Sequence, residues 1–283
     1  MDIKRVGVVG GGQMGQGIAQ AIATAGMEVT LVDLDEKLIR RAMERTSWGI
    51  QKLIKKGVLR PEQQDEILNR ITGTVNLKDL RRVDIIIEAV SENESLKLEL
   101  FGMLDPLCPP ETIFATNTSS IPVAKLAEVT MRQSQFVGIH FMNPVPIIEL
   151  VEIIPGPKTS KETLEVARSL CKRLGKTAIE VKDSPGFVVN RIMGPMINEA
   201  VYLLQEGVAG KEDIDTAMKL GTGHPMGPLA LADFVGLDTC LAILEVLHKE
   251  LKNPKYEPCP LLNEYVEKGK LGVKSGEGFY KYK

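Results

Sequence analysis

The chain has 283 residues, of which 43% are hydrophobic and 25% are charged, and its formal net charge is -2. The length fits two domains, the composition is typical of a globular protein, and the near-neutral charge argues against nucleic acid as a main partner. The four cysteines lie far apart without a C-x-x-C pair, so neither a zinc site nor a disulfide framework is predicted, and no metal is expected. The sequence has neither a secretory signal nor a bilayer-length apolar run, so we expect a cytoplasmic protein with no membrane partner.

Near the start of the chain, residues 5–9 (R-V-G-V-V) predict a strand that leads into G-G-G-Q-M-G and then into a helix over residues 16–25. Gly10, Gly12 and Gly15 stand in the G-x-G-x-x-G register of dinucleotide-binding loops. The first glycine permits a tight turn, the second lets the backbone approach a pyrophosphate, and the third lets the helix pack closely on the strand. Backbone N–H groups at the helix start then face the anion. The expected cofactor-binding residues of this loop are Gly10, Gly12, Gln13, Met14 and Gly15.

A second predicted strand, residues 28–32 (E-V-T-L-V), ends at Asp33. This acid follows the glycines by about 20 residues, the position from which a carboxylate binds the ribose 2′-hydroxyl group of the cofactor. The alternative is a strand-end aspartate that caps the next helix. No arginine follows Asp33 directly, so we expect NAD rather than NADP as the cofactor.

Residues 35–56 predict a long amphipathic helix rich in lysine and arginine. Charge runs of this kind are usually solvated helix faces. The excess of positive charge between Lys37 and Arg60 nevertheless leaves room for a phosphate-bearing ligand. Lys52 and Lys56 lie one helical turn apart on the same face, so they are the candidates for such a contact.

Two further predicted strands end in polar clusters. Residues 83–89 form a continuous apolar run followed by S-E-N-E-S-L-K, which places Glu92 at the strand's carboxyl end, and residues 112–116 are followed by N-T-S-S at 117–120. Ligands of open α/β sheets bind along this edge. The alternative for the second cluster is that a serine caps the helix that starts near Pro122.

The regular alternation of strands and helices ends at residues 135–142 and 147–154, which are both strand-like with only Asn143–Pro146 between them. A parallel neighbour would need a crossover of about a dozen residues, so we predict an antiparallel hairpin. His140 then lies near the end of the first strand, at the edge where a nicotinamide would bind, and histidine exchanges protons near neutral pH. Strand alternation puts Glu149 and Glu152 on opposite faces, so one of them can meet His140, but periodicity does not choose between them.

A catalytic role for His140 must be weighed against a simpler one, because a histidine in an apolar strand is more often a core residue than a base. The glycine loop, the ribose acid and the strand-edge position favour catalysis. Of the other two histidines, we expect His248 in L-E-V-L-H-K-E to be solvated and His224 in G-H-P-M-G-P to fix a loop.

A helix over 160–174 and a strand over 177–181 complete the first half, and K-D-S-P-G at 182–186 indicates a linker. We predict an α/β protein with a Rossmann-type, mostly parallel sheet and one antiparallel hairpin, followed by an all-α C-terminal domain. The expected domains are residues 1–184 for NAD binding and 185–283 for substrate binding and dimerisation. Broad apolar helix faces in the second domain favour packing on the first domain, on a second subunit, or on both. Helices are predicted over 187–206, with an interruption at Gly194-Pro195, and over 211–220, 237–251 and 261–268.

Taken in order, these motifs resemble the 3-hydroxyacyl-CoA dehydrogenase family, and particularly its short single-function 3-hydroxybutyryl-CoA dehydrogenase branch. The resemblance covers nearly the whole length. One local departure is Met142, where family members usually carry a second phenylalanine. The motifs are G-G-G-Q-M-G-Q-G-I-A, E-N-E-S-L-K, N-T-S-S, H-F-M-N-P-V-P, L-V-E, D-S-P-G-F-V-V-N-R, H-P-M-G-P, D-F-V-G-L-D and K-S-G-E-G-F-Y.

The resemblance implies an NAD-dependent L-3-hydroxyacyl-CoA dehydrogenase, with a short-chain acyl-CoA as substrate and a homodimer formed through the C-terminal domain. His140 resembles the catalytic base, and Glu152 resembles its carboxylate partner in preference to Glu149. Ser119 and Asn190 resemble groups that hold the substrate oxygens, Ser119 also being near the nicotinamide. The remaining implied contacts are Glu92, Lys97, Asn143 and Lys274 to the cofactor, and Lys52 and Lys56 to the CoA phosphates.

Two other functions remain open at the level of sequence. One alternative is a dehydrogenase that oxidises a free hydroxy acid or sugar acid, because a fold does not set the substrate. The other alternative is a structural relative that binds NAD without catalysis. The intact set of Ser119, His140, Glu152 and Asn190 speaks against that second alternative.

Overall fold

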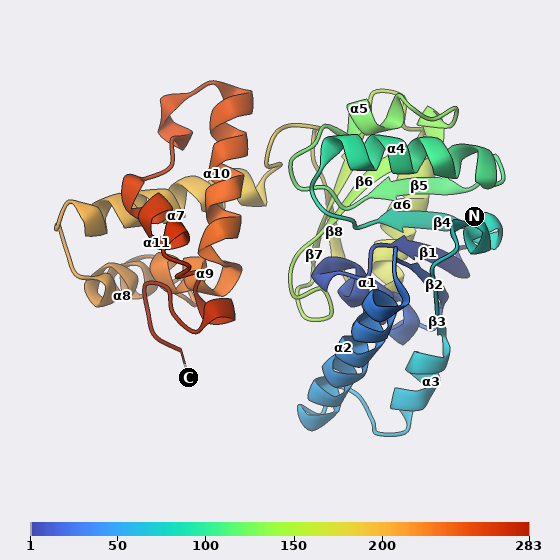
Figure 1. Cartoon of the computed structure of the whole chain (residues 1–283), viewed down its shortest axis with the longest axis horizontal. Coiled ribbons are helices and arrows are strands. Elements are labelled where there is room, and N and C mark those ends of the chain that lie inside the picture. The colour runs from blue at the N-terminus through green and yellow to red at the C-terminus, as the bar shows by residue number, and fades with distance from the viewer. Residues whose placement is uncertain (1, 283) are drawn as a thin grey trace. The chain divides into compact units, whose positions relative to one another are not determined.

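A computed structural model describes residues 2–282, which form two compact units that divide between Asp183 and Ser184. The first unit is an α/β structure and the second is helical (Figure 1). In the part of the chain that is described, no helix combines the length and the apolar character needed to cross a membrane.

The first unit is built on a single sheet of eight strands (Figure 1). The strands are β1 (Arg5–Val9), β2 (Glu28–Val32), β3 (Ile71–Thr74), β4 (Ile85–Glu88), β5 (Ile113–Thr116), β6 (Phe136–Phe141), β7 (Leu150–Pro155) and β8 (Thr177–Glu180). Their order is β3-β2-β1-β4-β5-β6-β7-β8, and the pair β6 and β7 is antiparallel whereas the other neighbouring pairs are parallel. The predicted mostly parallel sheet with an antiparallel hairpin is confirmed. Since β1 and β4 lead to opposite halves of the sheet, their carboxyl ends form the topological switch point where such sheets bind ligands.

Two details of the sheet differ from the prediction. Strand β3 was not expected, because its sequence I-T-G-T is short, contains a glycine and leaves most of its residues at least partly exposed at the sheet edge. The connection between β6 and β7 spans residues 142–149 and is longer than the predicted Asn143–Pro146. Glu149 therefore lies outside β7, so strand alternation does not apply to it.

In the described part of the first unit six α-helices accompany the sheet. Three of them begin with a side chain that accepts a backbone hydrogen bond: Asp35, Asn93 and Ser160 cap α2, α4 and α6 respectively. Such caps satisfy N–H groups that have no partner within the helix. Asp35, and not Asp33, is thus the aspartate that caps the second helix. The helices are α1 (Gln13–Thr24), α2 (Glu36–Lys55), α3 (Gln63–Asn69), α4 (Glu94–Leu104), α5 (Val123–Ala127) and α6 (Lys161–Arg173).

The sheet has a helix layer on each face (Figure 1). One face packs its alternate residues, such as Ile87 and Ile139, into a common core with α1 and α6. On the other face Phe101 of α4 lies against Phe114 and Phe136, with ring centroids 5.8 Å and 4.7 Å away. Because side chains alternate along a strand, this second face also carries the residues with polar side chains at the ends of β4, β5, β6 and β7. Those residues are Glu88, Thr116, His140 and Glu152.

The second unit packs its helices around a separate core that includes Val201, Leu229, Leu244 and Phe279. The expected interruption at Gly194-Pro195 is wrong, because α7 runs through Pro195. A proline inside a helix removes one hydrogen bond to the carbonyl four residues earlier, which here belongs to an exposed residue that water can reach. The helices are α7 (Val189–Gln205), α8 (Lys211–Thr222), α9 (Pro228–Val235), α10 (Leu237–Leu251) and α11 (Pro260–Glu267).

The last described residues are tied to α9 by Asp233, which is fully buried. Its carboxylate accepts hydrogen bonds from the backbone N–H groups of Phe279 and Tyr280, at 2.9 and 2.8 Å, and from the hydroxyl group of Tyr282, at 3.0 Å. A Cβ atom at Gly278 would lie only 2.0 Å from the Asp233 carboxylate. The tail can therefore approach Asp233 only with glycine at this position.

Candidate active site

The loop after β1 uses its three glycines for different purposes. Gly10 has a φ angle of +104°, and a Cβ atom there would lie 2.6 Å from the carbonyl oxygen of Ala89, which follows β4. A Cβ atom at Gly15 would lie 1.7 Å from the carbonyl oxygen of Gly10. At Gly12 a Cβ atom would meet nothing within 4 Å. Gly10 and Gly15 are thus required by the packing of the loop itself, whereas Gly12 leaves open space for a ligand.

The N-terminus of helix α1 is suited to binding an anion. Its first residue, Gln13, is exposed, the next, Met14, is half-buried, and the capping residue Gly12 offers no side chain to the helix start. No acidic residue occupies the first turn. The N–H groups of the first turn and the positive end of the helix dipole therefore suit a phosphate group. These residues fit the pyrophosphate of a dinucleotide.

Asp33 connects the end of β2 to the glycine loop. Its carboxylate accepts hydrogen bonds from the backbone N–H groups of Gly11, at 2.6 Å, and of Leu34, at 2.7 Å. The side chain is half-buried beside the loop that fits the pyrophosphate. This placement suits a carboxylate that binds the ribose of the same ligand.

His140 and Glu152 face each other across the β6–β7 pair. They are direct partners in the antiparallel register, and 2.8 Å separates His140 Nδ1 from Glu152 Oε2. The Glu152 side chain is fully buried and that of His140 is 8% exposed. Glu149 is exposed in the connection that precedes β7. The register thus brings Glu152 to the histidine, a choice that periodicity left open.

A carboxylate beside Nδ1 determines how this imidazole can exchange a proton. It favours the tautomer with the proton on Nδ1, so that Nε2 carries the lone pair that accepts a proton. The same carboxylate stabilises the imidazolium ion formed when Nε2 is protonated. The pair is therefore suited to general base and general acid catalysis.

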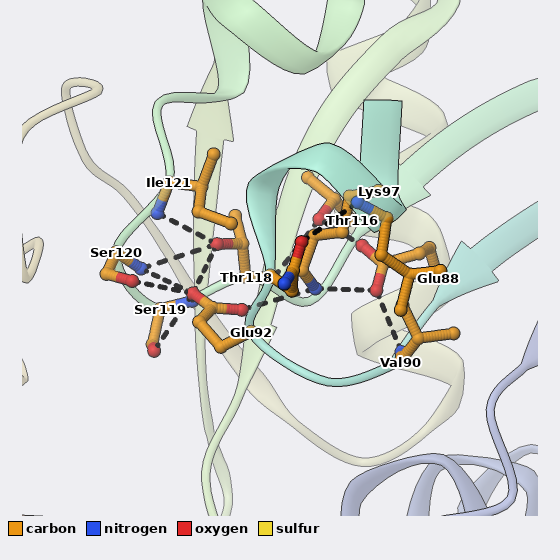
Figure 2. A network of polar contacts seen from close by, with 11 residues as sticks. Glu88, Val90, Glu92, Lys97, Thr116, Thr118, Ser119, Ser120 and Ile121 are labelled. Atoms are coloured by element: carbon orange, nitrogen blue, oxygen red, sulfur yellow. Dashed lines mark hydrogen bonds and ion pairs between the residues drawn. The ribbon is translucent and has the colours of Figure 1, made fainter. Parts of the chain in front are cut away.

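Glu92 accepts hydrogen bonds from the polar residues that follow β5 (Figure 2). Its Oε1 atom accepts hydrogen bonds from the hydroxyl group of Thr118 at 2.6 Å, from the N–H groups of Ser119 and Ser120 at 2.9 and 3.0 Å, and from the Ser120 hydroxyl group at 2.8 Å. The Ser119 hydroxyl group lies 3.3 Å from the same atom. Burial alone would raise the pKa of Glu92, but the charge of Lys97 and these hydrogen bonds outweigh burial and lower the pKa to about 2. Glu92 is therefore a carboxylate anion at any ordinary pH.

Lys97 lies behind Glu92, inside the unit. Its side chain is 1% exposed, and its Nζ atom is 2.6 Å from Glu88 Oε1 and 3.2 Å from Glu92 Oε2. Sequence reasoning did not select Glu88, although a single acid at the end of an otherwise apolar strand is the signal that could have identified it. It also did not select Asn117, whose side chain accepts a hydrogen bond from the N–H group of Phe141 at 2.9 Å.

The other predicted residues of the first unit lie at its surface. Asn143 is exposed in the connection that follows β6, and Lys176 fixes this connection by donating to the carbonyl groups of Val145 and Ile148, at 2.6 and 2.7 Å. Lys52 is exposed on α2, with its Nζ atom 3.4 Å from the centre of the Trp48 ring. Lys56 is exposed at the end of that helix.

Two predicted residues belong to the second unit. Asn190 is 7% exposed on α7, and the Lys274 Nζ atom lies 2.6 Å from Asp238 Oδ2. In that unit the expectation of a solvated His248 holds only in part, because the residue is half-buried and its Nδ1 atom is enclosed without a hydrogen-bond partner among the described residues.

A glycine loop at the switch point of a parallel sheet, an acid beside it and a His-carboxylate pair at the same edge are the parts that a dinucleotide-dependent dehydrogenase needs. Comparison with known proteins gives the same class. The NAD binding domain of 3-hydroxyacyl-CoA dehydrogenase matches residues 5–184, and the C-terminal domain of 3-hydroxyacyl-CoA dehydrogenase matches residues 186–282. The chain belongs to the 3-hydroxyacyl-CoA dehydrogenase family, which confirms the predicted enzyme class and its NAD cofactor.

Individual relatives cover the full length. The chain is 51% identical, over 100% of its length and 98% of the other's, to a probable 3-hydroxybutyryl-CoA dehydrogenase of Bacillus subtilis. It is 46% identical, over 99% of its length and 92% of the other's, to a mitochondrial hydroxyacyl-coenzyme A dehydrogenase of Mus musculus. Among solved structures, it is similar to (S)-3-hydroxybutyryl-CoA dehydrogenase from Ralstonia eutropha, with a TM-score of 0.93, 48% identity and 100% of both chains covered.

Proposed function

We propose that this protein interconverts short-chain L-3-hydroxyacyl-CoA and 3-ketoacyl-CoA with NAD, and that the preferred pair is 3-hydroxybutyryl-CoA and acetoacetyl-CoA. The observation that carries the proposal is the 2.8 Å contact between His140 Nδ1 and Glu152 Oε2 at the carboxyl edge of the sheet. The short chain length is supported by relatives named for the butyryl substrate, at up to 51% identity.

In the proposed oxidation the 3-hydroxyacyl group loses one proton and one hydride. Bound NAD supplies the acceptor for the hydride that leaves C3. His140 accepts the proton of the 3-hydroxyl group at Nε2, while Glu152 holds the ring and stabilises the imidazolium ion. In the reverse direction the protonated His140 returns this proton to the oxygen of the 3-keto group.

Other residues receive roles that rest on the resemblance and suit their surroundings. Ser119 would hold a substrate oxygen near the nicotinamide, since its hydroxyl group lies at the carboxyl end of β5. Asn190 would hold a second substrate oxygen. The exposed ammonium groups of Lys52 and Lys56 suit the phosphates of CoA. The proposed cofactor contacts are Gly10, Gly12, Gln13, Met14, Gly15, Asp33, Glu92, Asn143 and Lys274.

The decisive experiment is the reduction of 3-ketoacyl-CoA substrates of four to sixteen carbons, followed by the loss of NADH absorbance. We expect turnover with acetoacetyl-CoA and a preference for the short chains. Free 3-keto acids and sugar acids serve as controls for the alternative substrate class. Turnover of a free acid but not of its thioester would contradict the acyl-CoA assignment, and no turnover of any substrate would favour a non-catalytic protein.

For the two units we propose NAD binding in residues 1–184, and substrate binding and homodimer formation in residues 185–283. Exposed apolar side chains of the second unit support a dimer, with Leu220 82%, Ile192 66% and Phe234 48% exposed. Light scattering after gel filtration should give twice the mass of one 31.1 kDa chain.

We also propose a cytoplasmic location, because the four cysteines are free and buried as in reducing compartments. Cell fractionation tests it.

A further inference from the structure

We propose that Glu88 and Lys97 act together as a buried positioning device, which holds Glu92 in place and through it shapes the turn at residues 117–120 that carries Ser119. This inference rests on the dehydrogenase function proposed above. It gives Lys97 a role different from the direct cofactor contact that the resemblance implies. It also gives a role to Glu88, which neither sequence nor resemblance selected.

Glu88 is fixed from three directions (Figure 2). Its side chain is fully buried at the end of β4. The carboxylate accepts hydrogen bonds from the N–H group of Val90 at 2.8 Å, from Lys97 Nζ at 2.6 Å and from the Thr116 hydroxyl group at 2.7 Å. A buried charge with this many donors is a rigid anchor, because any movement would leave polar groups unsatisfied.

Lys97 links the fixed carboxylate of Glu88 to Glu92 through two ion pairs. Its ammonium group lies between two carboxylates, one fully buried and one 36% exposed. Two negative charges and one positive charge leave one negative charge in excess, and the more exposed partner, Glu92, can carry it at lower desolvation cost. Lys97 itself is 1% exposed, so it acts on a ligand through Glu92 and not by touching it.

Glu92 in turn determines the shape of the 117–120 turn. Successive N–H groups of Ser119 and Ser120 point at one carboxylate oxygen, which also receives the hydroxyl groups of Thr118 and Ser120. Converging N–H groups of this kind form a concave anion site, and hydrogen bonds to an ionised acceptor are the stronger ones. Ionised Glu92 therefore supports the conformation of this turn, together with the Thr118 hydroxyl group, which accepts from the N–H groups of Ser120 and Ile121 at 3.3 and 3.0 Å.

The position of the device favours a role in binding over one in stability alone. It lies at the carboxyl ends of β4 and β5, beside the switch point, where ligands of such sheets bind. A buried ion pair is often replaceable by apolar side chains of similar volume without loss of stability. Folding alone thus does not require this triad of charges.

The test compares Lys97→Met, the double variant Glu88→Gln/Lys97→Met and Glu92→Gln with the wild type. The control is Lys125→Met, which removes the exposed pair of Lys125 and Glu94, 2.7 Å apart and joining α5 to α4. The readouts are kcat and KM for acetoacetyl-CoA and NADH between pH 5 and pH 9, and the Kd of NADH from fluorescence titration.

In Lys97→Met two carboxylates are left without their cation, so burial and mutual repulsion raise the pKa of Glu92 towards the working range. We expect KM and Kd for NADH to rise about tenfold at low pH and to recover as the pH rises. The double variant removes one negative charge as well, so its loss should start at a lower pH and be smaller. Glu92→Gln should show the loss at every pH, and Lys125→Met should behave as the wild type.

A loss in Lys97→Met that does not depend on pH, or a double variant that is worse than the single one, would show a purely structural role and overturn the proposal. Normal KM and Kd values in Lys97→Met would overturn it as well. If the wild type fails to reduce acetoacetyl-CoA, the proposed function fails, and the Kd series for NADH still decides whether the device operates.

Discussion

His140 and Glu152 are direct cross-strand partners, and the buried Glu152 carboxylate lies beside the imidazole, with Oε2 2.8 Å from Nδ1. His140→Gln removes the proton acceptor and should reduce kcat by about 10²–10⁴, the usual range for general acid–base catalysis. Glu152→Gln keeps a hydrogen-bonding oxygen but not the charge, so we expect a smaller reduction. Steady-state kinetics with acetoacetyl-CoA measure both. Glu149→Gln is the matched control, and an effect equal to that of Glu152→Gln would contradict the assignment.

The glycine loop allows cofactor binding to be separated from folding. Gly12→Ala adds a Cβ atom where nothing lies within 4 Å, so the melting temperature should stay within a few degrees while the Kd of NADH rises. Gly15→Ala would place a Cβ atom 1.7 Å from the carbonyl oxygen of Gly10 and should lower the melting temperature strongly. Calorimetry and fluorescence titration check the pair. Unchanged NADH affinity in Gly12→Ala would show that the ligand does not approach this loop.

Glu92 should contribute to stability in a pH-dependent way. Its pKa is lowered from 4.5 to about 2 in the folded state, so its contribution is fully present above about pH 4.5 and is lost as the pH falls towards 2. Urea unfolding at several pH values should therefore show a smaller difference between wild type and Glu92→Gln at pH 2.5 than at pH 6. A difference that grows on acidification would contradict the lowered pKa.

Lys176 fixes the connection between β6 and β7, in which Asn143 lies. Its Nζ atom donates to the carbonyl groups of Val145 and Ile148, so Lys176→Met leaves both without this partner. We expect a loss of about 1–2 kcal/mol in the free energy of unfolding and a higher KM for NADH. The control is Lys172→Met, on the exposed face of α6. Equal effects of the two substitutions would argue against this role.

The four cysteines should be unreactive in the native protein. Burial raises the pKa of Cys108 to about 11 and those of Cys171 and Cys240 to about 12, and Cys259 shifts in the same direction for the same reason. The thiolate is the reactive form, so a disulfide reagent should label native protein slowly. All 4 cysteines should react after denaturation. Rapid labelling of a native thiol would disprove this expectation.

The sequence predicted most of the sheet because its strands are apolar runs with clear ends. It could not predict β3, whose four residues carry little hydrophobic signal. It placed Asp33 correctly at the end of β2 but left its capping role open, and the cap turned out to be Asp35. It also left Glu149 and Glu152 open, since the choice depends on the pairing register of β6 and β7.

The ion pairs that join Lys97 to Glu88 and Glu92 could not be predicted from the sequence, for a physical reason. Lysine is almost never fully buried unless it is paired, and its pairing partner here stands nine residues away at the end of a strand. Nothing in the local pattern of E-N-E-S-L-K indicates that the lysine points inward. Only the packing of α4 on the sheet brings its ammonium group to both carboxylates.

The attachment of the tail to Asp233 bears on the order in which the protein is made. Phe279 belongs to the core of the second unit, and three hydrogen bonds to Asp233 come from residues 279–282. That core is incomplete on the ribosome until these residues have emerged, whereas every strand of the sheet has already been synthesised by residue 180. During translation the sheet can therefore form first and the helical unit afterwards, and a ribosome stalled shortly before residue 279 should carry a protease-resistant first unit followed by a sensitive second one.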